Sequence, residues 1–232
     1  MPYSKSRSRK GFESNLSKLK SLSLNASYKK TNIKYEHRVL IYQSAIFLAS
    51  ASIEEYIKNF FEDLIFEYKS KDAILSDIPE NIRALKLLTS QMNIFKTYVN
   101  TGDEARSIKA ITKAWDNYDI VDNSLKLEYH IKSRDIIGTK KYPSIKNLKI
   151  LYNRLGINDI IKALEKKGKK DYKSQLESFL SIREAISHQA APSLTYTDVK
   201  RNFENLSDII NQLDRLKYSQ IIKLSGNKFW PN

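Results

Sequence analysis

A long run of apolar residues with helical spacing constrains the fold of this chain more than any other feature. Between about His37 and Tyr68, apolar side chains recur at steps of three and four residues. These residues are Ile46, Ala49, Ile53, Ile57, Phe60 and Leu64. A second apolar side, which includes Leu48, Tyr56 and Phe61, widens this surface beyond what one neighbouring helix covers. The pattern predicts a long helix that packs against several others in an all-α, up-and-down bundle.

The chain carries a large excess of positive charge. Of its 232 residues, 40 are Lys or Arg and 26 are Asp or Glu, which gives a formal net charge of +14. Such an excess attracts polyanions, with nucleic acid the first candidate and an anionic membrane surface the second. The absence of cysteine excludes disulfides, thiolate catalysis and cysteine-based zinc sites.

Several other classes of function lack their sequence signals. The six glycines are isolated, so the glycine-rich loops that cradle phosphates or dinucleotides are missing. The three histidines, His37, His130 and His188, form no metal-binding pattern, and we expect neither a metal nor another cofactor. The longest uncharged apolar stretch is too short to span a bilayer, and the N-terminus has no apolar leader. The sequence therefore predicts a cytoplasmic protein without a membrane partner.

The rest of the chain predicts mainly helices. Pro79 fits the first turn of one of them, and Ser144 is a candidate N-terminal cap of another. The helices predicted after the first run over about 80–98, 104–116, 144–155, 157–165, 173–189 and 195–216. We assign them to one helical domain over residues 37–225, followed by a short C-terminal tail over 226–232.

Residues 1–36 differ from the rest in composition, since Ser, Lys, Arg and Asn dominate. Nine basic residues stand against only Glu13 and Glu36. This composition predicts a partly disordered basic arm, with a short helix around Phe12–Leu24. The arm is either a solubilising tail or a segment that contacts RNA.

The middle of the chain carries the period of a strand. Leu125, Leu127, Tyr129 and Ile131 alternate with polar residues, and the turn residues before them would allow pairing with 118–121. This predicts a small β-hairpin inserted in the helical domain. His130 falls on the polar side, where we expect an exposed histidine without a chemical role.

Arg183 lies in an unusual place. On the helix predicted over 173–189 it falls in the middle of the apolar side. A cation there is costly unless it meets a carboxylate, a phosphate or a subunit boundary. One alternative is a salt bridge to Glu54 or Glu55 of the long helix.

His188 follows five residues later, about 140° round an ideal helix, so the two side chains diverge. Pro192 ends the helix soon after, which places His188 in the last turn. There the helix dipole and Glu184 favour the imidazolium form, a state suited to proton donation. The alternative is a histidine that only caps carbonyl groups.

The following helix is predicted to begin at 195–198, with Thr197 as a candidate cap. Lys200 and Arg201 lie just across the loop from His188. They are candidate phosphate contacts if the site binds RNA, and otherwise a solvated first turn.

The segment from Arg183 to His188 is similar to the Arg-x4-6-His motif of the HEPN superfamily, small helical bundles of which many are metal-independent endoribonucleases. The segment 51–57 resembles part of the first HEPN helix, which often carries a Glu facing the motif. Residues 142–148 and 155–160 resemble the RiboL-PSP-like group. The resemblance spans about 39–216. Two positions depart from the usual pattern, namely Glu184 after the Arg and Gln189 after the His, and the charge of Glu184 would weaken phosphate binding by repulsion.

The resemblance implies a homodimer whose active site lies at the two-fold interface, so that Arg183 of one subunit and His188 of the other face one cleft. The implied activity is metal-independent cleavage of single-stranded RNA in a toxin or antiphage-defence protein, with an antitoxin or defence-system protein as a candidate partner. His188 would be the general acid/base and Arg183 would stabilise the transition state, with Glu54 positioning Arg183 and Ser187 or Glu184 orienting His188.

Two other hypotheses remain at this stage. A non-catalytic HEPN-like module would bind RNA through its basic charge, or would bind another protein, and it would use Arg183 as an interface salt bridge. A protein held on anionic membranes by its basic arm is the third.

Overall fold

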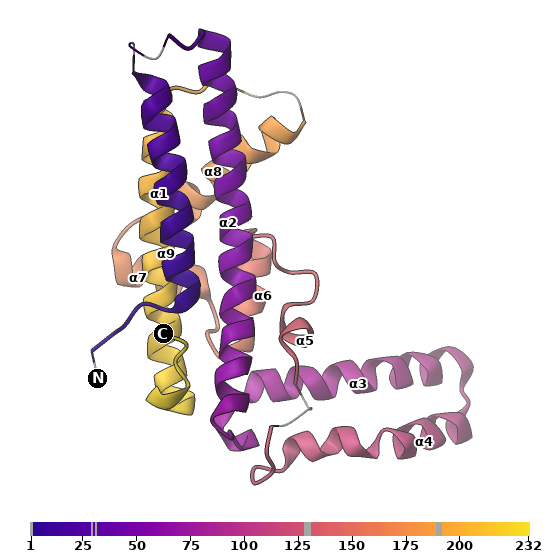
Figure 1. The fold of residues 1–232 in the computed structure, drawn as a ribbon. Coiled ribbons are helices and arrows are strands. Elements are labelled where there is room, and N and C mark those ends of the chain that lie inside the picture. The colour runs from indigo at the N-terminus through magenta and orange to yellow at the C-terminus, as the bar shows by residue number, and fades with distance from the viewer. Residues whose placement is uncertain (1, 29, 31, 128–130, 189–191) are drawn as a thin grey trace.

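The computed structural model is an all-α bundle and describes residues 2–28, 30, 32–127, 131–188 and 192–232. Its long helices are α1 (Arg7–Ser27), α2 (Tyr35–Ser70) and α9 (Tyr196–Ser225). They lie side by side, with α1 antiparallel to the other two (Figure 1). The shorter helices α6 (Ile145–Arg154), α7 (Ile160–Gly168) and α8 (Tyr172–Ser187) pack against them.

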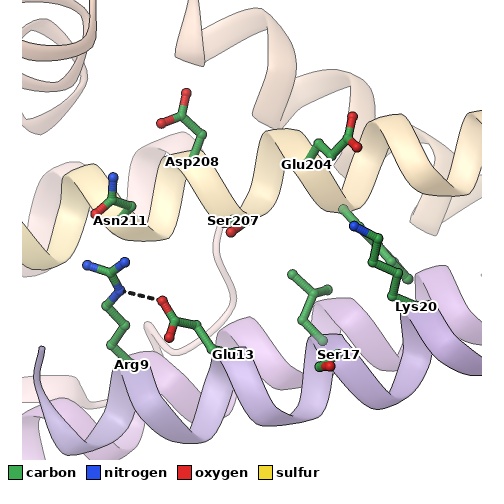
Figure 2. A pocket seen from close by; sticks show the side chains of 10 residues that line it. Arg9, Glu13, Ser17, Lys20, Glu204, Ser207, Asp208 and Asn211 are labelled. Carbon is green, nitrogen blue, oxygen red and sulfur yellow. Dashed lines mark hydrogen bonds and ion pairs between the residues drawn. The ribbon is translucent and has the colours of Figure 1, made fainter.

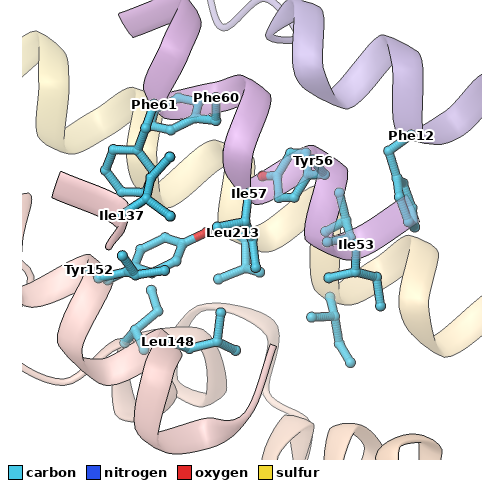
Figure 3. Packing of buried hydrophobic residues seen from close by; sticks show 14 of the residues in the cluster. Phe12, Ile53, Tyr56, Ile57, Phe60, Phe61, Ile137, Leu148, Tyr152 and Leu213 are labelled. Carbon is cyan, nitrogen blue, oxygen red and sulfur yellow. The ribbon is translucent and has the colours of Figure 1, made fainter. Parts of the chain in front are cut away.

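The predicted long helix is confirmed as α2, and the core lies around it. Tyr56, Ile57 and Phe60 of α2 are buried against Leu148 and Tyr152 of α6. Figure 3 shows this cluster, together with Phe12 from α1 and Leu213 from α9. Of the predicted second apolar side, Tyr56 and Phe61 are buried and Leu48 is 49% exposed, so the prediction holds for part of that side.

The N-terminal segment differs from the expected disordered arm, because most of it forms helix α1. Small and apolar residues repeat on one side of α1 and are buried against α2 and α9. These residues are Phe12, Leu16, Leu19, Ser23 and Ala26. Their spacing of four and three residues is that of a packed helix seam. The many Ser and Lys residues of the segment lie mainly on the other faces.

The start and the end of the chain meet. The backbone N–H of Arg7 donates to the carbonyl of Pro231 at 2.9 Å, and the indole of Trp230 donates to the Ser4 carbonyl at 3.0 Å. Trp230 and Phe229 are buried, the latter in the 3-10 turn η4 (Asn227–Phe229). The predicted tail is therefore also part of the packed domain.

A buried polar network fixes the start of α1. Asp214 of α9 is fully buried and accepts hydrogen bonds from the Ser6 hydroxyl at 2.5 Å, the Ser6 backbone N–H at 3.1 Å and the Tyr3 hydroxyl at 2.7 Å. Ser6 is also the N-cap of α1. One turn after Asp214, the buried ammonium of Lys217 lies 3.9 Å from the same carboxylate and 3.4 Å from the ring centre of Phe60.

A helical hairpin leaves the bundle near the C-terminal end of α2. It consists of α3 (Glu80–Thr101) and α4 (Glu104–Lys113), which lie side by side and antiparallel (Figure 1). Gly102, with φ 64°, ends α3 in the left-handed conformation that glycine adopts at low cost. The 3-10 turns η2 (Leu75–Asp77) and η3 (Trp115–Val121) flank the hairpin.

The expected β-hairpin is wrong for the described residues. Lys126 forms a single antiparallel bridge with Ile74, and residues 118–121 belong to η3. Leu127 and Ile131 are buried in the core of the helical domain. Residues 128–130, including His130, lie outside the described residues. A short helix, α5 (Ser133–Ile137), follows.

Two caps position the C-terminal half of the domain. Ser144 caps α6 by accepting from the N–H of Asn147, as predicted. The cap of α9 is Thr195 and not Thr197: its hydroxyl accepts from the N–H of Asp198, and the Asp198 carboxylate accepts from the N–H of Thr195 at 3.0 Å. The hydrogen bonds from Thr195 lower the pKa of Asp198.

This capping box predicts unequal effects for two neighbouring threonines. Replacing Thr195 with Ala leaves a helix N–H without a partner and should lower the free energy of unfolding by about 1 kcal/mol. Thr197→Ala, at an exposed position of the first turn, should change it far less. Urea denaturation followed by circular dichroism compares the two. An equal decrease in the free energy of unfolding for both variants would show that the Thr195–Asp198 capping box does not stabilise α9.

Within the described residues, no helix is long and apolar enough to cross a membrane.

Candidate functional site

Helix α8 carries the Arg183–His188 segment, and its two halves differ in burial. Asp171 caps the helix by accepting from the N–H of Ser174. Tyr172, Leu176 and Phe179 anchor the first half in the core. From Ile182 onward the side chains are half-buried or exposed. The rigid first half therefore presents the second half at the surface.

Arg183 is held by aromatic rings. Its guanidinium carbon lies 5.1 Å from the ring centre of Phe47 on α2 and 5.4 Å from that of Tyr142, which precedes α6. Both distances are within the range of cation–π attraction. The Nε atom of Arg183 is buried and has no hydrogen-bond partner among the described residues. Nε itself is covered by protein, but the half-buried guanidinium has no ion pair among the described residues, so its charge remains available to an anion.

No carboxylate compensates Arg183 within the described part of the chain, contrary to the expected salt bridge and to the positioning role expected for Glu54. Glu54 is half-buried and lies two turns beyond Phe47 on α2, with no ion pair to Arg183. Glu55 is exposed and accepts from Asn15 of α1 at 3.5 Å. Phe47 and Tyr142 occupy the place in which the carboxylate was expected.

His188 is exposed and forms the C-cap of α8, where its backbone N–H donates to the Glu184 carbonyl at 3.1 Å. The hydroxyl of Ser187 donates to the Arg183 carbonyl at 3.1 Å, so it stays on its own helix and does not touch the imidazole. Glu184 is exposed. The imidazole is open to solvent, and the expected orienting contact from Ser187 is not formed.

The loop after α8 is fastened to α2. The amide of Gln43 donates to the Pro192 carbonyl at 3.1 Å, and the hydroxyls of Tyr35 and Ser193 lie 2.6 Å apart. Leu194 is buried just before the cap of α9. The N-terminal half of α2 therefore supports Arg183 through Phe47 and the loop through Tyr35 and Gln43. Residues 189–191, which include Gln189, lie outside the described part.

Lys200 and Arg201 lie on the first turns of α9, and each has a carboxylate neighbour on its own helix. Lys200 is 3.9 Å from Glu204, and Arg201 is 3.1 Å from Asp198. Both side chains are largely exposed, and surface ion pairs of this kind are weak. A phosphate can compete with such partners, so these residues remain candidates for RNA contact.

A separate groove of about 530 Å³ runs between α1 and α9. Figure 2 shows Arg9 and Lys20 on its rim, together with the carboxylates of Glu13, Glu204 and Asp208. The Nε of Arg9 donates to Glu13 at 2.9 Å. Because acidic side chains outnumber basic ones there, the groove is a poor place for a phosphate chain.

A sequence model of the RiboL-PSP-HEPN family matches residues 13–216. The chain therefore belongs to this HEPN family, and the match includes most of α1, which the motif resemblance left out. Membership points to a ribonuclease or another RNA-related function. No curated protein and no solved structure matches the chain.

Two residues of the site, Phe47 and Tyr142, were missed from the sequence. Phe47 lies on α2 between the apolar positions Ile46 and Leu48, so it resembled ordinary packing. In the structure it is 41% exposed, unlike its buried neighbours Ala45, Ile46 and Ala49. An aromatic residue outside the main apolar stripe was the available signal.

Proposed function

We propose that the protein is a metal-independent endoribonuclease that cleaves single-stranded RNA, acting as a toxin or antiphage effector. The observation that carries the proposal is Arg183, a cation held between two aromatic rings, with a buried donor and no carboxylate partner among the described residues. A phosphate is the natural ligand of such a guanidinium. Family membership and the net charge of +14 support an RNA substrate.

The proposed reaction breaks one P–O bond. The ribose 2′-oxygen attacks the adjacent phosphorus while the 5′-oxygen of the next nucleotide leaves. His188 takes the proton of the 2′-hydroxyl or gives one to the leaving oxygen, and Arg183 stabilises the charge that develops on the phosphate oxygens. The products are a 2′,3′-cyclic phosphate and a 5′-hydroxyl. The test is cleavage of single-stranded RNA in EDTA, with identification of both ends.

Two copies of the chain would complete the site. Arg183 packs inward against Phe47, whereas His188 is exposed at the end of the same helix. We therefore retain the proposal of a two-fold dimer in which each cleft receives Arg183 from one copy and His188 from the other. An antitoxin or defence-system partner would act by covering this end of α8.

The alternative proposal is an RNA-binding module without catalysis. Glu184 favours it, because this exposed carboxylate lies one turn before His188 and would repel a phosphate approaching the imidazole. Salt-sensitive RNA binding without cleavage, unchanged by His188→Ala, would select this alternative.

The aromatic contacts of Arg183 predict an effect on activity that is larger than the effect on stability. Phe47→Ala removes one face of the cation–π contact, worth about 0.5–1 kcal/mol, at a partly exposed position. We expect cleavage to fall roughly threefold to tenfold, as Arg183 loses its fixed position. The matched control is Phe66→Ala, which is also exposed on α2 but lies about five turns beyond Phe47 and contacts Arg7 instead of Arg183. Equal rates for both variants would contradict the positioning role of Phe47.

A further inference from the structure

The α3–α4 hairpin carries an apolar surface that nothing in the described part of the monomer covers. Along α3 and α4 a set of large apolar side chains is 41–78% exposed. They are Leu88, Met92, Phe95 and Val99 on α3, with Ile108, Ile111 and Trp115 on and just after α4. We call these seven residues the hairpin stripe. By contrast, α3 buries only Ile82 and α4 only Ser107.

The hairpin stripe forms one face. At about 100° per residue, its members fall within about 60° of one another on each helix. We take half-buried Ile94 on α3 and buried Ser107 on α4 as marking the sides on which the two helices meet. Around the axis of each helix, the stripe lies about 100° from the side that meets the other helix. The direction of this rotation, followed along the chain, is the same for both helices. Because the helices are antiparallel, equal turns in the same sense bring both rows to the same side of the hairpin.

The area of this face matches what one partner contributes to a stable interface. At about 150–250 Å² for each large side chain, the exposed fractions amount to roughly 800 Å², the share of one partner in an interface of standard size. The largest apolar patch of an ordinary monomer is smaller, at about 300–600 Å². The spacing of the stripe, three and four residues on each helix, is that of helices which pack against other helices.

The charge of the hairpin favours a second copy of the same chain as the partner. Residues 80–121 hold six basic and five acidic residues, a net charge of +1, whereas the whole chain carries +14. Two copies repel each other over most of their surface, and the repulsion is weakest where the charge is close to zero. The hairpin also projects away from the bundle, so two hairpins can meet without a clash of the bundles (Figure 1).

We propose that the hairpin stripe pairs with the stripe of a second copy, which gives a four-helix contact with two-fold symmetry. This contact is distinct from the Arg183–His188 end, since the hairpin follows the C-terminal end of α2 and Arg183 packs on its N-terminal half. It does not depend on the proposed ribonuclease activity.

The test is the mass of the particle in sedimentation equilibrium. Phe95→Glu places a charge in the middle of the stripe and should weaken this association about 100-fold, which halves the mass. The mass falls from dimer to monomer, or from tetramer to dimer if the α8 ends also pair. Ile108→Glu, on the other helix of the hairpin, should do the same. The matched control Asn93→Glu adds the same charge at an exposed position off the stripe and should leave the mass unchanged.

Circular dichroism establishes that each variant is folded. The proposal would be overturned if wild type, Phe95→Glu and Ile108→Glu all had the same particle mass. It would also be overturned if Asn93→Glu lowered the mass as much as Phe95→Glu does. The proposal would also be overturned if the wild-type protein did not self-associate through the stripe but bound lipid vesicles or another protein through it. The stripe would then be assigned to that partner.

Discussion

Arg183→Ala and His188→Ala should each abolish most RNA cleavage while the protein stays folded. Loss of the general acid/base lowers the cleavage rate about 10²–10⁴-fold, and loss of a cation that stabilises the transition state lowers it about 10²–10³-fold. Neither side chain belongs to the core, since Arg183 is half-buried and His188 is exposed. The measurement is the initial rate of cleavage of single-stranded RNA in EDTA, with thermal unfolding followed in parallel.

Arg201→Ala is the matched control for this experiment, because it removes an exposed arginine from α9 that is already paired with Asp198. Arg201→Ala should raise KM and leave kcat nearly unchanged. The number of counterions released on RNA binding, taken from the salt dependence of the binding constant, should fall by about one. If His188→Ala still cleaved RNA, the proposed mechanism would be contradicted. Cleavage lost equally in all three variants would mean that charge alone, and not the geometry around Arg183, decides activity.

Asp214→Ala should be among the most destabilising single substitutions in the protein. It leaves Ser6 and Tyr3 without their acceptor and leaves the buried ammonium of Lys217 without its counter-ion. Breaking a buried pair in this way costs about 3–5 kcal/mol. Since Asp214 holds the cap of α1, the damage should concentrate there, and hydrogen exchange should show α1 opening before α2. Thermal unfolding gives the overall loss.

Glu204→Ala on the same helix is the control, since it removes an exposed carboxylate with a weak ion pair and should cost less than about 1 kcal/mol. Lys217→Met should cost less than Asp214→Ala, because Asp214 loses its counter-ion but keeps the hydrogen bonds from Ser6 and Tyr3. An Asp214→Ala protein that unfolds like Glu204→Ala would show that the network does not secure α1.

Lys217 also predicts how stability depends on pH. Burial lowers the pKa of its ammonium to about 7, although Asp214 and Asp63 favour the charged form. Between pH 7 and about 10 the unfolded chain holds this proton and the folded chain does not, so the free energy of unfolding should rise with pH. Above about pH 10 it should fall, because burial raises the pKa of Tyr56 and Tyr152 and only the unfolded tyrosines ionise.

Urea unfolding at several pH values measures this dependence. The rise should disappear in Lys217→Met, while the fall above about pH 10 should remain. A wild-type protein whose stability is flat from pH 7 to 10 would show that Lys217 keeps its proton in the fold.

The elements that were predicted correctly are those whose pattern is local. Helix α2 and the cap of α6 follow from residue spacing within a few turns. A short helix around Phe12–Leu24 was predicted, but the full length and the packing of α1 could not be inferred in this way, because its seam contains Ser23 and Ala26 and is buried against α2 and α9. The expected β-hairpin failed for a similar reason, since residues 125–127 pair with the distant residues 73–75 through a single bridge and not with residues 118–121.

The roles of Arg183 and His188 stay a prediction, whereas the contacts of Arg183 could not be predicted from the sequence. The motif identified Arg183 and His188, yet the expected partner of Arg183 was a carboxylate of α2. Which side chain of a long helix faces a distant arginine depends on the rotation of α2 against α8, and residue spacing does not define that rotation. Phe47 and Tyr142 come from different elements and meet only in the fold.

The contact between the two ends of the chain bears on the order in which the molecule assembles. The partners of Ser6 and Ser4 are Asp214 and Trp230, more than two hundred positions later. Contacts at such separation form late, after the helices between them. The apolar seam of α1 packs against α2, the next helix along the chain, so this contact can form early. The buried cap of α1 at Ser6 is completed only when Asp214 of α9 is in place, so the final fastening of α1 follows the formation of α9.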